Sequence, residues 1–145
     1  MVTIVAIRPI KSEKGQSYIE TLTQAFESDY MELEDMNGLP EDDKQVVIFH
    51  PRKYDDNPDW LTPEKVENFN DFDFPEVAYY VFNSDYDSDI IQDISDNFPP
   101  LKDKARWVRI PTVKWERGGF TSIHAQTACA IVLWERWKKL GKNVE

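Results

Sequence analysis

The sequence Arg106-Trp107-Val108-Arg109-Ile110-Pro111-Thr112 leads through Gly118-Gly119 into a long segment ending at Gly141. From Arg106 to Ile110, charged and apolar side chains alternate, and this period predicts a β-strand. Pro111 lacks an N–H group, so we expect the strand to end there. The paired glycines favour a loop. This part of the chain therefore predicts a strand, a loop and a long helix.

The long helix is expected to start at a Thr121 or Ser122 cap and to stop at Gly141. Its apolar face is predicted from residues that recur at helical spacing, namely Ile123, Thr127, Ala130, Ile131, Trp134, Trp137 and Leu140. Cys129 is the single cysteine, so no internal disulfide can form. Its place inside a helix favours a buried small hydrophobe over a reactive thiol.

Length and composition predict one domain spanning residues 1–145. With 41% hydrophobic residues and five Trp, the chain can bury a substantial core. It has no apolar run of about 18 residues, the length that crosses a bilayer, and its first residues lack the basic start of a signal peptide. The single cysteine fits a reducing compartment. We therefore expect a cytoplasmic protein without a membrane span.

Charge is distributed unevenly along the chain. The net charge is −10, which argues against general nucleic-acid binding. Residues 101–145 nevertheless carry +6, so the first hundred residues carry −16. The basic segment is either an RNA-facing surface or a surface that docks on acidic parts of the same protein or of a second copy.

Strands and helices alternate in the rest of the sequence. Strands are predicted at Val2–Ile7, Tyr30–Asp35, Gln45–His50 and Val77–Phe82, and helices at Ser17–Ser28, about Pro63–Phe69 and about Ser88–Asn97. This alternation predicts an α/β fold, with a mostly parallel sheet flanked by helices.

The C-terminal stretch resembles the last conserved block of the SpoU branch of SPOUT RNA methyltransferases. That family has a strand reading Arg-Ile-Pro-Met, a loop, and a helix opening Ser-Leu-Asn-Leu or Ser-Met-Asn-Leu, followed by small residues and a Tyr-Glu pair. Here Arg109-Ile110-Pro111-Thr112 matches the strand, and Ser122-Ile123-His124-Ala125 falls where the helix opens. Ala128, Ala130 and Trp134-Glu135 fall on the small residues and on the Tyr-Glu pair.

The earlier part of the chain is similar to the same family with departures. Arg8-Pro9, followed by Gly15 and a helix, resembles the family's first motif, but the motif's Asn is replaced, and no Lys or Arg occurs between Lys14 and Lys44 to stand for its essential Arg. The family's Gly-x-Glu-x-x-Gly-Leu slot here begins at Asn83, with Asp85 in place of the Glu and Ser88 in place of the second glycine.

The resemblance implies a C-terminal trefoil knot whose loops hold S-adenosylmethionine, in a protein closest in size to the tRNA wobble-ribose methyltransferases. The cofactor residues that it implies are His50, Pro51, Asn83, Ser84, Asp85, Ile110, Thr112, Ile123 and Ala125. The implied function is ribose 2′-O-methylation of RNA, with His124, Arg109 or Arg117 assisting. His50 follows a strand and is a candidate acid or base, although a turn histidine is the simpler interpretation.

Two functions remain open from the sequence. One is the active methyltransferase, and the other is a catalytically inactive relative that keeps the fold as a binding or dimerisation module, which the missing Arg and Asn favour. The resemblance also implies a homodimer paired through the last helix and the first, with Trp134, Trp137, Ala125 and Ala128 as contact residues. One Cys and two His offer no zinc spacing, and Asp85-Asp87-Asp89 lacks the Gly and Glu of a calcium loop, so no metal is predicted.

Overall fold

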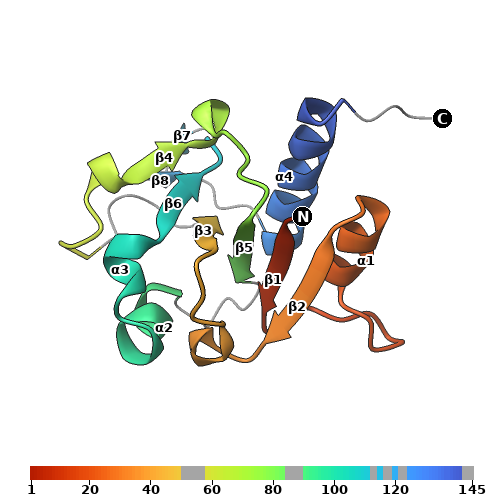
Figure 1. Ribbon diagram of the computed structural model, residues 1–145, viewed down its shortest axis with the longest axis horizontal. Coiled ribbons are helices and arrows are strands. Elements are labelled where there is room, and N and C mark those ends of the chain that lie inside the picture. Colours follow the sequence, from red (N-terminus) through yellow and green to blue (C-terminus); the bar gives the residue numbers. More distant parts are fainter. Residues whose placement is uncertain (50–57, 84–89, 112–113, 116–118, 121–123, 142–145) are drawn as a thin grey trace.

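The centre of the protein is a six-stranded sheet in which every neighbouring pair is parallel (Figure 1). The structure is a computed structural model that describes residues 1–49, 58–83, 90–111, 114–115, 119–120 and 124–141. The strand order is β2-β1-β5-β3-β6-β4. The strands are β1 (Thr3–Ile7), β2 (Asp29–Leu33), β3 (Gln45–Phe49), β4 (Val66–Asn68), β5 (Ala78–Asn83) and β6 (Arg106–Arg109). The predicted α/β fold with a parallel sheet is confirmed.

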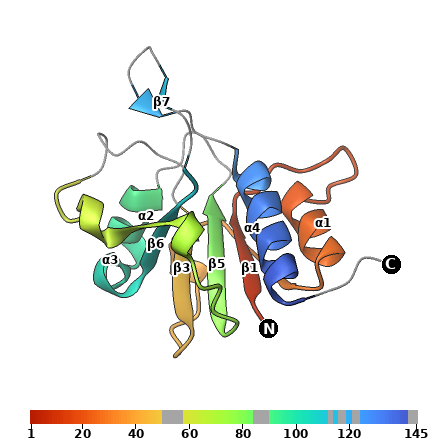
Figure 2. The same cartoon turned by 90° about the horizontal axis from the view of Figure 1, so that it is seen from above.

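Helices cover both faces of the sheet. The helices α1 (Tyr18–Ala25) and α4 (Ala125–Lys139) lie side by side on one face (Figures 1 and 2). The helices α2 (Ile90–Asn97) and α3 (Leu101–Lys104) and the 3₁₀ turn η1 (Met36–Gly38) pack on the other face. A short antiparallel hairpin of β7 (Lys114–Trp115) and β8 (Gly119–Phe120) projects beyond the sheet between β6 and α4 (Figure 2).

One handedness rule accounts for this division between the faces. Connections between parallel strands are almost always right-handed, so connections that run in opposite directions along a sheet must cross opposite faces. The β1–β2 connection through α1 runs toward the β2 edge and covers the α4 face. The β5–β6 connection through α2 and α3 runs toward the β4 edge and covers the opposite face.

The core consists of two layers separated by the sheet. In β1, Ile4 and Ala6 face α1 and α4, whereas Val5 and Ile7 face α2 and η1. Because both faces are covered, the strands are apolar on both sides, as parallel strands generally are. The continuous apolar runs in the sequence therefore reflect burial on two sides.

An aromatic segment that follows β4 completes the α4 face. Phe69, Phe72 and Phe74 are buried there, and Phe49 stacks on Phe82 with ring centres 4.9 Å apart. Arg106 holds the short edge strand in place. Its guanidinium donates two hydrogen bonds to the Glu67 carboxylate at 2.8 and 2.6 Å.

Two predicted elements near the sheet edge differ in the structure. The helix expected at about Pro63–Phe69 is wrong. Pro63–Lys65 forms only a 3₁₀ turn, η3, because Val66–Asn68 pairs with β6 as β4, and Phe69–Asp71 forms the turn η4. The prolines after α2 do end that helix, but Leu101 then starts the short helix α3, which the sequence did not predict.

The long helix α4 was predicted, but its start and its buried face were wrong. Its N-cap is His124 rather than Thr121 or Ser122, which lie outside the described residues. The buried residues are Ala128, Cys129, Val132, Leu133 and Arg136, whereas Trp134 and Leu140 from the predicted face are exposed. The small side chains of Ala128 and Cys129 let the helix approach the sheet closely, and the bulky tryptophans lie on its flank. Cys129 is buried as predicted, and burial raises the pKa of its thiol.

Candidate functional site

The carboxyl edge of the sheet holds the candidate site. The connections after β1 and β5 leave in opposite directions, so these two neighbouring strands form a topological switch point. In open parallel sheets, ligands bind outside the carboxyl ends of the strands at such a point. Arg8 follows β1 directly, and Asn83 is the last residue of β5, where it pairs with Ile7.

Arg8 joins the ends of β1 and β2. Its backbone adopts a φ of +46°, which is uncommon outside glycine, and its N–H donates to the Leu33 carbonyl at 3.0 Å. Its Nε donates to the Glu34 carbonyl at 2.9 Å. The sequence marked Arg8 only as part of an Arg-Pro motif, and no local pattern signalled that it would reach the end of a neighbouring strand.

The strand order brings together segments that are distant in sequence. The strands β5, β3 and β6 are consecutive and parallel in the sheet, so their carboxyl ends lie at one edge. The helix α4 begins near the carboxyl ends of the strands and runs back toward their amino ends (Figure 2). Asn83 after β5, Ile110 after β6 and Ala125 at the start of α4 therefore belong to one region. Of the other predicted cofactor residues, His50, Pro51, Ser84, Asp85, Thr112 and Ile123 lie outside the described residues.

The predicted catalytic residues are placed differently from one another. His124 is exposed at the N-cap of α4, and within the described part of the helix its side chain makes no capping hydrogen bond. Arg109 is only 7% exposed. Because side chains alternate along a strand, Arg109 leaves β6 on the same face as Trp107, opposite the face that α4 covers. Arg117 lies outside the described residues.

Asn83 stands where the family's motif has its first glycine, but its backbone angles do not require a glycine. Among the described non-glycine residues, positive φ occurs at Arg8, Glu27 and Phe74. Asn83 is an ordinary strand residue of β5. Any need for glycine at this position would therefore come from the space that a ligand requires and not from the backbone angle.

A groove opens between the aromatic segment and α4, next to the end of β6. We call it the α4 groove. It has a volume of about 370 Å³ and is lined by Phe69, Asn70, Phe72, Phe74, Ile110, Pro111, Ile131, Glu135 and Lys139. Ile110 is also a predicted cofactor residue, so the α4 groove adjoins the candidate cofactor site.

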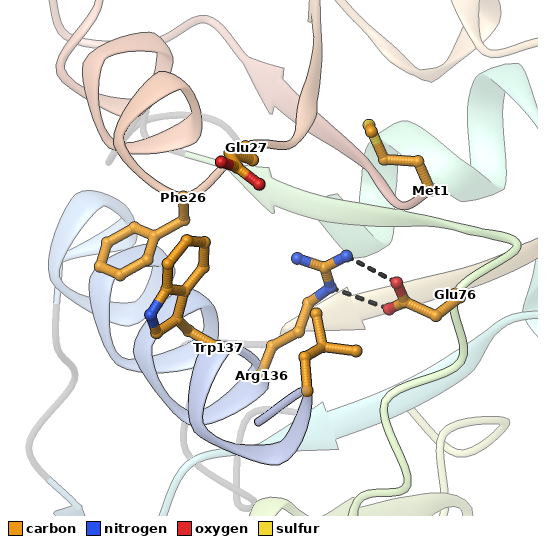
Figure 3. Close-up of a pocket in the computed structure, with 7 residues that line it drawn as sticks. Met1, Phe26, Glu27, Glu76, Arg136 and Trp137 are labelled. Atoms are coloured by element: carbon orange, nitrogen blue, oxygen red, sulfur yellow. Dashed lines mark hydrogen bonds and ion pairs between the residues drawn. The ribbon is translucent and has the colours of Figure 1, made fainter. Parts of the chain in front are cut away.

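A second pocket, the basal pocket, lies at the carboxyl end of α4 (Figure 3). It has a volume of about 330 Å³ and is lined by Met1, Phe26, Glu27, Glu76, Arg136, Trp137 and Leu140. Arg136 donates two hydrogen bonds to the Glu76 carboxylate, at 2.9 and 2.6 Å, and a third to the Ser28 hydroxyl at 3.3 Å (Figure 3). The Phe26 and Trp137 rings meet edge to face with centres 5.7 Å apart.

Many cations of the basic segment are engaged within the protein. Arg106 pairs with Glu67 and Asp73, and Arg136 pairs with Glu76. Lys139 donates to the Phe72 carbonyl at 3.1 Å. Of the two interpretations of the basic segment, docking on acidic parts of the same protein accounts for these contacts.

Asp93 links α2 to the turn that follows β2. Its carboxylate accepts hydrogen bonds from the Met36 N–H at 3.0 and 3.2 Å and from the Asn97 amide at 2.7 Å. Burial nevertheless raises the pKa of Asp93 above its usual range, because desolvation outweighs the hydrogen bonds that favour the charged form. This carboxylate is engaged in holding the fold together near the candidate site.

Comparison with known proteins gives no family. No model of a known protein family matches the chain, and no curated protein matches it. Within the described residues, no helix is long and apolar enough to cross a membrane, and no group of three or more His, Cys, Asp or Glu could hold a metal ion.

Proposed function

We propose that this chain is an S-adenosylmethionine-dependent RNA ribose 2′-O-methyltransferase of the SpoU type, with a C-terminal trefoil knot. The observation that carries the proposal is the strand order. The resemblance assigned the cofactor to residues after β3, β5 and β6 and to the start of α4, and these three strands are neighbours with their carboxyl ends at one edge. A sheet with the same elements in another order would have separated them.

The residues of this edge suit the proposed chemistry. S-adenosylmethionine supplies an electrophilic methyl group, and its acceptor would be a ribose hydroxyl that must be positioned and must lose its proton. His124 is exposed at the start of α4 and would accept that proton. The small Ala125 beside it leaves room for the cofactor. Arg109 leaves β6 on the face opposite α4, so the proposal gives it no contact with the reacting atoms.

The same proposal includes a homodimer paired through α1 and α4. Trp134 on α4, Leu140 at its C-cap and Tyr18 on α1 are between 42% and 46% exposed and offer apolar surface for this contact. Ala128 is buried against the sheet and would not contribute, contrary to the expectation from the sequence. A Trp134→Glu variant is expected to convert the dimer to a monomer in light scattering after size-exclusion chromatography. A wild-type monomer at high concentration would contradict this part.

A second candidate is a catalytically inactive relative with the same fold. Two observations favour it. Helix α1 carries Glu20 in its first turn and no basic residue in its last, and Arg106 and Arg136 are paired with carboxylates of the same chain. A protein with a net negative charge, whose arginines are paired with its own carboxylates, would bind RNA phosphates weakly.

Calorimetric titration with S-adenosylmethionine and S-adenosylhomocysteine separates the two candidates. The methyltransferase is expected to bind with micromolar affinity, about −8 kcal/mol. Ala125→Phe would fill the space proposed for the cofactor and abolish the heat of cofactor binding. Thr127→Phe is the matched control, because Thr127 is exposed on the same helix and should tolerate the same ring. If no heat of binding is detected up to millimolar ligand, the methyltransferase proposal is wrong and the inactive relative remains.

A further inference from the structure

The two edges of the sheet differ in how they are protected (Figure 1). The edge strand β4 has only three residues and lies between the 3₁₀ turns η3 and η4. The edge strand β2 has five residues, stays in register with β1 throughout, and contains no Pro, Lys or Gly. Proteins usually blunt an edge with a short strand, a proline, a lysine or a bulge, because an open edge pairs with another strand. Within the described residues, β2 is therefore the open edge of the sheet.

The backbone hydrogen bonds show which groups of β2 face the open side. The N–H of Asp29 donates to the carbonyl of the residue before β1 at 3.2 Å, and the carbonyl of Leu33 accepts from the N–H of Arg8 at 3.0 Å. Alternate residues of a strand direct their N–H and C=O groups to opposite sides, so the odd-numbered residues of β2 bond to β1. The N–H and C=O groups of Tyr30 and Glu32 therefore point away from the sheet.

These outward groups match a second copy of the same strand. When two copies of β2 run antiparallel about a twofold axis at Met31, Tyr30 of each copy lies opposite Glu32 of the other. The two residues of such a pair exchange both backbone hydrogen bonds, so every outward N–H and C=O of the strand is paired. Asp29 then lies opposite Leu33, so no two carboxylates of the strands face each other. A register centred on Glu32 would instead place like charges opposite each other, which is unfavourable.

The polar side chains of β2 are held by contacts within their own chain. Lys11 forms an ion pair with the Glu32 carboxylate at 2.8 Å, which compensates its charge. The Tyr30 hydroxyl donates to the same carboxylate at 3.1 Å and lies 2.8 Å from the Ser17 hydroxyl at the start of α1. Both side chains are thus held on the α1 face of the sheet. Because each copy still carries a net charge of −10, association should strengthen as salt screens the repulsion.

We infer that two copies of this chain pair through β2, so that their sheets join into one continuous sheet. The inference does not rest on the proposed function, and its contact differs from the one proposed through α1 and α4. Backbone hydrogen bonds supply the specificity, as in other cases of strand addition to a sheet edge. Since two five-residue strands bury little surface, this contact should form at higher protein concentration than the helical one.

A Met31→Cys variant tests the register. Residues of a non-hydrogen-bonded antiparallel pair have Cα atoms about 4.5 Å apart, a distance that a disulfide can span. Oxidation should therefore give a covalent dimer of twice 17.0 kDa on a denaturing, non-reducing gel. Leu33→Cys is the matched control, because Leu33 is half-buried on the same face but would lie opposite Asp29, and it should give no covalent dimer. The wild type should give none either, since Cys129 is buried.

Two substitutions at Glu32 in the Met31→Cys background test the backbone pairing. Glu32→Pro removes an outward N–H group that makes no bond to β1, and proline is tolerated at such edge positions, so the cross-link should be lost. Glu32→Ala removes the same side chain but keeps the N–H group, and it should retain the cross-link. Trp134→Glu in this background should also retain it, which separates this contact from the one through α1 and α4.

Amide hydrogen exchange of the wild type measures the pairing without a substitution. Once the paired form predominates, the protection of the Tyr30 and Glu32 amides should rise about threefold for each tenfold increase in protein concentration, as mass action requires. Exchange rates that do not depend on concentration, or equal cross-linking of Met31→Cys and Leu33→Cys, would overturn the inference. Protection of these amides by an unrelated strand-forming peptide, in a protein that does not self-associate through β2, would assign the edge to another partner and also overturn it.

Discussion

The two ends of α4 are held in different ways. At its carboxyl end, Arg136 is bound to Glu76 and to Ser28, and Trp137 packs on Phe26 of the α1 terminus. At its amino end, the exposed His124 begins the helix, and within the described residues its side chain makes no capping hydrogen bond. The carboxyl end is therefore held by an ion pair and a ring contact, whereas the side chain at the N-cap does not cap the amino end.

This difference indicates where stability and function are located along one helix. The Arg136–Glu76 ion pair and the Phe26–Trp137 contact, which we call the basal clamp, fix the carboxyl end of α4 against the segment before β5 and against α1. Variants that remove the basal clamp should destabilise the protein, whereas a side chain that caps the amino end should stabilise it. Three variants at the two ends test this comparison, and a fourth, at Asp93, lies away from α4.

The largest effect is expected from Glu76→Ala. Arg136 is only 4% exposed, so removal of its partner leaves a buried guanidinium without a carboxylate. Because the Glu76 side chain is 40% exposed, we expect a loss of about 2–4 kcal/mol in the free energy of unfolding, below that of a fully buried pair. Urea denaturation measures this loss. Combining Glu76→Leu with Arg136→Met should recover most of it, because no buried charge remains. A double variant as unstable as Glu76→Ala would show that the pair is not the clamp.

Phe26→Ala tests the aromatic part of the same end. The ring meets Trp134 and Trp137 edge to face, but it is only half-buried, so the expected loss is about 2 kcal/mol, below that of a fully buried Phe. Thermal unfolding followed by circular dichroism measures it. Val77→Ala, at an exposed position before β5 and outside both helices, is the control and should change stability by less than about 0.5 kcal/mol. Equal losses of stability in the two variants would show that the Phe26 ring does not help to hold the carboxyl end of α4.

At the amino end, His124→Asp is expected to stabilise the protein. Aspartate accepts hydrogen bonds from the first N–H groups of a helix and complements its dipole, so the gain should be about 1 kcal/mol in urea denaturation. His124→Ala should give no gain. If His124 is the proposed base, the Asp variant should also lose methyl transfer while binding the cofactor. A destabilised Asp variant would show that the amino end is already well anchored.

The smallest effect is expected at Asp93, near the candidate site but away from α4. Its pKa is raised in the folded protein, so the folded state binds the proton more tightly than the unfolded state. The contribution of Asp93 to stability is therefore greatest below the unfolded pKa and declines as pH rises through the folded pKa.

Asp93→Asn removes this dependence while keeping an acceptor for the Met36 N–H. Relative to the wild type, the variant should become more stable between pH 3 and pH 7, by less than about 1 kcal/mol because the group is partly screened by solvent. Urea denaturation across this range measures the change. Asp96→Asn, exposed one turn further along α2, is the control. If the difference in the free energy of unfolding between variant and wild type became smaller as pH rises, it would contradict a cost of burying the Asp93 carboxylate.

Most of the strands, the helices α1 and α2 and the presence of a long last helix could be predicted from local sequence patterns. The apolar runs Val46–Phe49 and Ala78–Phe82 have the length and the β-branched or aromatic content of buried strands, and Ser17 caps α1 as its residue type favours. It also predicted that Cys129 would be buried. These features follow from local propensity and from the period of the apolar residues.

Long-range packing, by contrast, sets which face of α4 is buried and which strands are neighbours. Apolar residues lie on more than one side of α4, so spacing alone could not choose between Trp134 and Leu133, and the close approach of Ala128 and Cys129 to the sheet made the choice. Likewise, β4 forms because Val66–Asn68 pairs with β6, a partner about 40 residues away. The site depends on the same kind of pairing, because the order β5-β3-β6 is set by long-range contacts that no local pattern in the sequence encodes.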